Sequence, residues 1–68
     1  MRGYSTSETK RMVRKIFFGR ATKEEVYKFK SFCLCMVKKE FHPVKRDLYN
    51  QVVSDNLEVA YSLQKELR

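Results

Sequence analysis

The sequence has little of what breaks or crosslinks a chain: one proline, two glycines, two cysteines and no tryptophan. Because glycine and proline are so few, no stretch has the composition of a linker. A chain of 68 residues also has room for only one hydrophobic core. We therefore expect one helical domain that spans residues 1–68.

The two cysteines, Cys33 and Cys35, are separated by a single residue. On a helix, side chains two positions apart point about 200° away from each other, so a disulfide between them would require a break in the helix. We expect two free thiols, with Cys33 in the core and Cys35 as an inert thiol near the surface. Free thiols are typical of a reducing compartment.

Residues suited to metal binding or catalysis are equally scarce. His42 is the only histidine, and no carboxylate pair at ligand spacing accompanies it. The cysteine spacing is not that of a zinc site. We predict no metal site, no cofactor and no enzymatic activity.

No apolar run approaches the roughly 18 residues that cross a bilayer, and the start of the chain lacks the pattern of a secretory signal. Binding of the first helix to a membrane surface is also disfavoured, because Ile16 and Phe17 are needed in the core. We expect a cytoplasmic protein with no membrane contact.

Apolar residues recur at helical spacing along most of the chain, and no segment alternates between apolar and polar residues as a strand does. The sequence therefore predicts an all-α, single-domain bundle of three or four helices. Residues 1–4 precede the first helix and are expected to fray. The expected helices cover about residues 7–18, 23–41, 44–53 and 56–67.

Several helix ends are indicated by capping residues. Ser5 with Glu8, and Thr22 with Glu25, have the spacing of a capping box at a helix start. Gly19 can adopt the left-handed conformation that ends the first helix. The second helix is apolar over about half of its circumference, which predicts a central position with neighbours on two sides.

The segment after Pro43 allows two interpretations. Its apolar residues share one arc, as in a single long helix. Ser54, Asp55 and Asn56 interrupt it, because their short side chains compete for backbone hydrogen bonds and favour caps and turns. We favour two helices, with Ser54 or Asp55 capping the second, and keep one continuous helix as the alternative.

Positive charge is in excess and unevenly distributed. The net charge is +7, and residues 1–46 hold 13 of the 15 lysines and arginines but only four of the eight acidic residues. A basic surface of this kind attracts an anionic partner, such as nucleic acid or an acidic protein surface.

The first helix carries the most pronounced cationic face, opposite its apolar arc. In a continued helix, Phe18 would lie in the middle of that face, where it could stack on a base. We expect instead that the helix ends and Phe18 turns into the core, because Gly19 follows directly. The polar edge of the second helix extends this surface if the two helices pack side by side. The residues that we expect to bind nucleic acid or a partner are Lys10, Arg11, Arg14, Lys15, Phe18, Arg20, Lys28, Lys38 and Lys39.

These features lead to two hypotheses. The first is a small nucleic-acid-binding accessory or regulatory protein that contacts phosphates through its cationic helical face, with little sequence specificity. The alternative is a protein-interaction module, an inhibitor or adaptor, that docks the same face on an acidic surface of a partner protein. The apolar residues of the last helix either pack against a second copy, giving a homodimer, or close the core of one chain.

Overall fold

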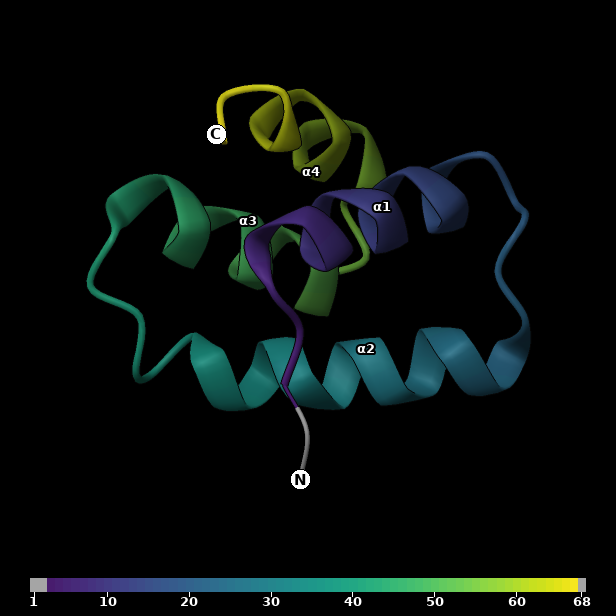
Figure 1. Ribbon diagram of the computed structural model, residues 1–68, viewed down its shortest axis with the longest axis horizontal. Helices are drawn as coiled ribbons and strands as arrows, with labels where there is room; N and C mark the ends of the chain where they lie inside the picture. The colour runs from purple at the N-terminus through teal and green to yellow at the C-terminus, as the bar shows by residue number, and fades with distance from the viewer. Residues whose placement is uncertain (1–2, 68) are drawn as a thin grey trace.

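Four helices make up most of the computed structural model, which describes residues 3–67 (Figure 1). They are α1 (Thr6–Phe17), α2 (Lys23–Met36), α3 (Pro43–Val53) and α4 (Leu57–Gln64). Over the described residues there is no strand, so the predicted all-α bundle is confirmed, with four helices rather than three. None of these helices is long and apolar enough to cross a bilayer.

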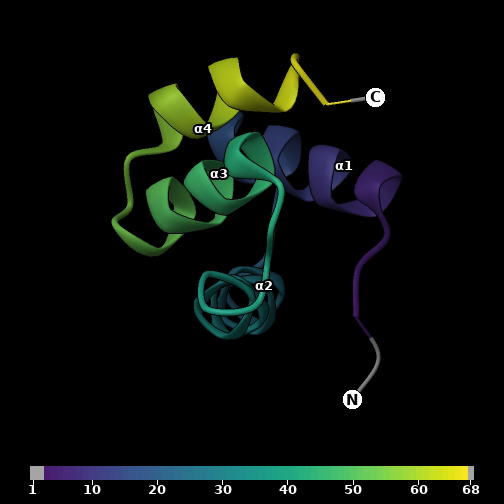
Figure 2. The same cartoon turned by 90° about the vertical axis from the view of Figure 1, so that its left-hand side faces the viewer.

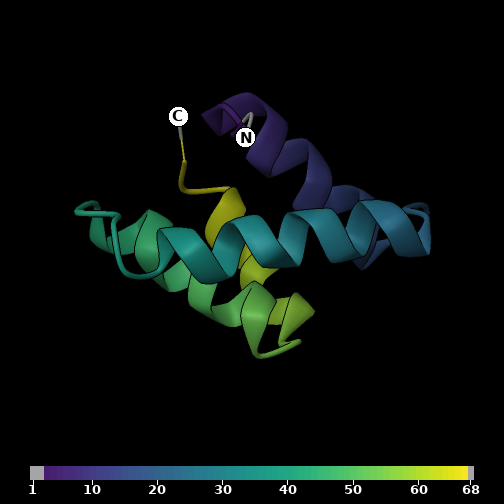
Figure 3. The same cartoon turned by 90° about the horizontal axis from the view of Figure 1, so that it is seen from below.

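The helices are stacked with α2 on one side, α1 and α3 in the middle and α4 on the opposite side (Figures 1 and 2). Seen from below, α2 lies across both α1 and α3 (Figure 3). The expected central position of α2 is therefore wrong, because only one of its sides is covered. The buried core residues are Met12, Val13, Ile16, Phe29, Phe32, Cys33, Leu48, Tyr49, Val52, Ala60 and Leu67.

Both predicted capping boxes are present. The Glu8 amide donates to Ser5 Oγ at 3.2 Å while the Ser5 amide donates to Glu8 Oε1 at 2.9 Å. Thr22 and Glu25 make the same pair of bonds, at 3.1 and 2.9 Å. Each cap satisfies backbone donors that a helix start otherwise leaves free, which stabilises the helix by about 1 kcal/mol.

Helices α1 and α3 end in the same way. Gly19 has φ of 69° and Asp55 has φ of 63°, both in the left-handed region. The next amide in each case donates to a carbonyl five residues back, from Arg20 to Lys15 and from Asn56 to Gln51, each at 2.8 Å. These are Schellman motifs, which satisfy the last carbonyls of a helix.

The segment of Ser54, Asp55 and Asn56 therefore separates two helices, as we favoured. The expected cap of the last helix is wrong in detail: Ser54 is the C-cap of α3, and Asn56 is the N-cap of α4 without a side-chain capping bond. Asp55 cannot cap α4 because it holds the left-handed position that ends α3.

Helix α2 ends at Met36, five residues before the expected end. Residues 37–39 form a turn that reverses the chain, so that α3 packs back against α2. Phe41, the last residue of the expected helix, is 93% exposed in the connection that follows.

The segment before α1 is anchored to the core at Tyr4. Its ring centroid lies 5.1 Å from that of Phe29 and 4.9 Å from that of Phe32. Residues 1 and 2 of the segment expected to fray lie outside the described residues.

Candidate binding surface on α1 and α4

The cations of α1 lie beside α4, which runs antiparallel to α1. Lys10 Nζ donates to the Leu67 carbonyl at 2.8 Å, and Arg14 donates to Gln64 Oε1 at 3.2 Å. Both acceptors are neutral, so these bonds fix the two side chains in place without neutralising their charge. Lys10 also lies near the carbonyl-rich end of α4, where a cation is favoured.

Lys15 has a different partner. Its ammonium lies 2.7 Å from Glu25 Oε2 in the first turn of α2, and this contact links α2 to α1. The hydrogen bond from Lys15 lowers the pKa of the Glu25 carboxyl, and the backbone N–H of Thr22 lowers that pKa further. Because Lys15 is paired with a carboxylate, it contributes less than its neighbours to the positive field of α1.

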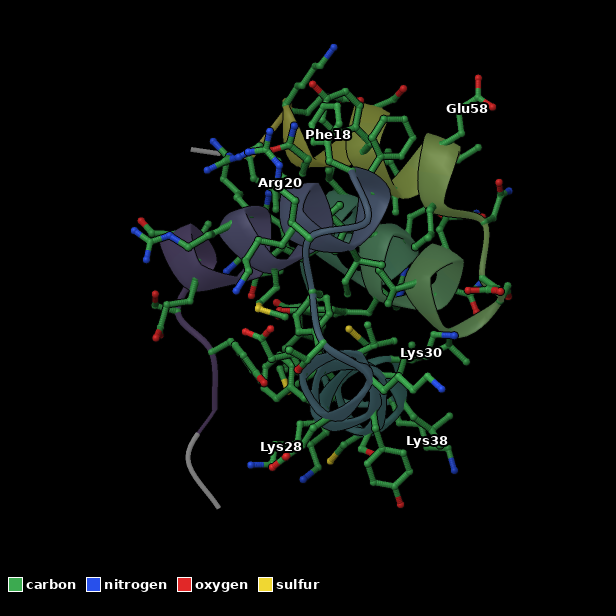
Figure 4. All side chains as sticks on the ribbon, turned by 90° about the vertical axis from the view of Figure 1, so that its right-hand side faces the viewer. Phe18, Arg20, Lys28, Lys30, Lys38 and Glu58 are labelled. Carbon is green, nitrogen blue, oxygen red and sulfur yellow. The ribbon has the colours of Figure 1, made fainter. Side chains whose placement is uncertain are left out.

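Arg11 and Arg20 are exposed and make no ion pair or hydrogen bond with the residues that the structure describes. Arg11 is an exposed residue of α1. Arg20 follows in the turn after the helix, where Figure 4 shows it close to α1. A guanidinium in this state is available for bidentate contact with a phosphate or a carboxylate.

Three aromatic rings lie at the C-terminal end of the same face. The rings of Phe17 and Tyr61 are stacked with centroids 4.4 Å apart, and Phe18 contacts Tyr61 edge-on at 5.5 Å. Lys65 lies over the Tyr61 ring, with Nζ 4.7 Å from its centroid. This aromatic cluster (Phe17, Phe18 and Tyr61) adjoins the cations of α1.

The expectation that Phe18 turns into the core is wrong, although α1 does end before it. Phe18 is 56% exposed, and it is the C-cap of α1 with nearly helical backbone angles. The Phe18 side chain therefore points in nearly the same direction as the cationic face of α1. The chain leaves the helix only at Gly19, where φ becomes positive.

The remaining predicted contact residues lie elsewhere. Lys28 projects from α2 on the side away from α1 (Figure 4), and Lys38 and Lys39 are exposed in the turn after α2. Lys28 is paired with Glu24 at 3.1 Å. Because α2 packs mainly against α3, its polar edge and the cationic row of α1 do not form one continuous surface.

The residues with other chemical potential are in structural positions. His42 is the N-cap of α3, and its Nδ1 accepts a 3.5 Å hydrogen bond from the Lys45 amide. Burial raises the pKa of the Cys33 thiol to about 12, as expected for a core cysteine, whereas Cys35 is exposed. Within residues 3–67 there is no group of three or more metal-binding side chains.

The contribution of α4 to this surface was not predicted. Tyr61, Gln64 and Lys65 lie beside α1 only because α4 folds back along it. The sequence counts Tyr61 among the apolar residues of the last helix, but it does not identify which helix Tyr61 contacts.

Comparison with protein families, curated proteins and solved structures finds no match for this chain. The functional proposal therefore rests on the chemistry of the surface itself.

Proposed function

We propose that this protein binds nucleic acid through the outer face of α1, as an accessory or regulatory protein with little sequence specificity. The observation that carries the proposal is the row of four cations without an acidic partner among the described residues, placed beside an exposed aromatic cluster. The four cations are Lys10, Arg11, Arg14 and Arg20.

Each part of this surface suits a different part of the ligand. The guanidinium groups of Arg11 and Arg20, which have no partner among the described residues, suit phosphate oxygens, and the release of condensed counterions drives such binding. Phe18 presents an exposed ring on which an unpaired base can stack. The combination favours single-stranded nucleic acid, whose bases are accessible, over a closed duplex.

Fluorescence anisotropy of labelled single-stranded DNA, single-stranded RNA and duplex DNA tests the proposal. The decisive variant is Arg11→Glu with Arg20→Glu, because neither side chain has a partner among the described residues whose loss would destabilise the fold. Lys38→Glu with Lys39→Glu is the matched control, since it makes the same change of charge in the turn that follows α2.

We expect the Arg11 and Arg20 variant to lose binding and the control variant to keep it. Equal losses in the two variants would mean that net charge, and not this surface, determines binding. If no nucleic acid binds the unmodified protein at low salt, the proposal fails, and an acidic protein surface becomes the partner for the same cations.

A further inference from the structure

Two hollows lie between α2 and α3 on the outside of the bundle, and we refer to them together as the groove. One part, of about 270 Å³, has an almost entirely apolar lining formed by Tyr27, Lys30, Ser31, Leu34 and Val53. A second part, of about 350 Å³, continues toward the start of α3 and is lined by Val37, Pro43, Arg46, Asp47 and Asn50. Because α3 runs back along α2, the two parts follow one another along the same seam.

Large apolar side chains stand exposed along this groove. Tyr27 is 74% exposed and Leu34 is 58% exposed, and they lie seven residues apart, on one face of α2. Helix α4 lies at the opposite side of the bundle from α2 and does not cover these side chains (Figure 2). This pattern of uncovered residues is typical of a surface that binds a helix laid along the seam.

Charged groups of both signs lie beside the groove, and two of the cations have no ion pair among the described residues. Lys30 and Lys38 lie on the same side of α2, and Lys28 lies on the other (Figure 4). Lys30 is paired with Asp55 at 3.0 Å, whereas Lys38 and Arg46 are exposed and have no ion pair among the described residues.

Two acidic groups lie at the groove. Asp55 is paired with Lys30, whereas Asp47 accepts a 3.1 Å hydrogen bond from the neutral amide of Gln51, which leaves its charge in place. An occupant with carboxylates along its edges would meet Lys38 and Arg46.

We propose that the seam between α2 and α3 binds an acidic amphipathic helix of a partner protein. Apolar side chains spaced three, four and seven residues apart enter the groove between Leu34 and Val53 and contact Tyr27. Carboxylates beside that apolar stripe face Lys38 and Arg46. This surface shares no residue with the candidate nucleic-acid surface, so the two proposals can be tested separately.

The probe for this test is a synthetic peptide of about 16 residues, long enough to form a helix on binding. Leucines every three or four residues make one face apolar, and glutamates occupy the other positions. Two control peptides isolate the two requirements. In one the same residues are shuffled so that the leucines do not align, and in the other every glutamate is replaced by lysine.

Leu34→Ser is the decisive variant, because it removes a side chain at the centre of the groove that contributes little to the buried core. Phe18→Ser is the matched control, since Phe18 is similarly exposed, at 56% against 58%, but lies outside the groove. Thermal unfolding of both variants establishes that they fold. Backbone amide shifts in the NMR spectrum locate the peptide, and anisotropy of the labelled peptide gives its affinity.

We expect the acidic peptide to shift the amides of Tyr27, Leu34 and Val53. Leu34→Ser should weaken its binding at least about tenfold, as for a residue at the centre of an interface, and Phe18→Ser should leave it unchanged.

Four results would overturn the proposal. They are the absence of binding at millimolar peptide, equal binding of the shuffled or the lysine peptide, unchanged affinity in Leu34→Ser, and self-association of the protein alone that Leu34→Ser abolishes. The last result would identify a second copy of this chain as the occupant.

Discussion

The salt dependence of nucleic-acid binding can be worked out from the cations of α1. Lys10 and Arg14 bond to neutral acceptors, and Arg11 and Arg20 have no partner among the described residues, so about four charges can neutralise phosphates. For a single strand, the logarithm of affinity then falls against the logarithm of salt with a slope of about −2.8. Between about 50 and 200 mM salt, the affinity should fall about 50-fold.

Arg11→Ala with Arg20→Ala should halve that slope. With about two neutralised phosphates, the expected slope is about −1.4, and the same change of salt should weaken binding only about sevenfold. The assay is a series of anisotropy titrations of labelled single-stranded DNA at four or more salt concentrations. Lys38→Ala with Lys39→Ala serves as the control and should keep the slope of the unmodified protein. A slope that is the same in both double variants would refute the assignment of these phosphates to α1.

Three further predictions concern stability. Gly19→Ala should lower the free energy of unfolding by about 1 kcal/mol, because φ is 69° and nothing lies within 4 Å of the added Cβ to add a clash. An unchanged midpoint in urea would contradict this. At the equivalent position in α3, Asp55→Gly should be more stable than Asp55→Ala by about 1 kcal/mol, since both lose the Lys30 ion pair and differ only in left-handed preference. Equal unfolding midpoints in the two variants would show that the turn changes its backbone conformation to accommodate alanine. The Glu25 carboxyl has its pKa lowered from 4.5 by Lys15, so it stabilises the fold above pH 4.5 and this contribution is lost as pH falls through the lowered pKa. Glu25→Gln should therefore lower the melting temperature at neutral pH and change it little in acid. A lower melting temperature that persists in acid would show that the substitution acts through packing.

Local features of the fold were predictable because they depend on a few neighbouring residues. The capping box of Ser5 and Glu8 satisfies donors within one turn, and Gly19 ends α1 by a conformation that glycine adopts readily. The turn at Asp55 was also indicated, because short polar side chains favour turns. The sequence did not indicate that Asp55 would take the left-handed position and leave Asn56 as the cap.

The candidate surface was only partly predictable, because it depends on contacts between distant segments. Helical spacing identified the cationic face of α1, but it did not show that Glu25 pairs with Lys15 or that Gln64 accepts from Arg14. The position of Phe18 was mispredicted for the same reason. An aromatic residue at a helix end turns inward only if the core has room, and here Tyr61 provides an alternative contact at the surface.

The apolar arc of α2 is wider than the single chain requires. Phe29, Phe32 and Cys33 fill the side that faces the core, while Tyr27 and Leu34 occupy a second side that this chain leaves in water. Exposed apolar residues scattered singly need no explanation, but these two stand on the same face and line one groove. The periodicity predicted a helix with neighbours on two sides, and the fold supplies one of them. An acidic helix in the groove would supply the second, with its carboxylates facing Lys38 and Arg46.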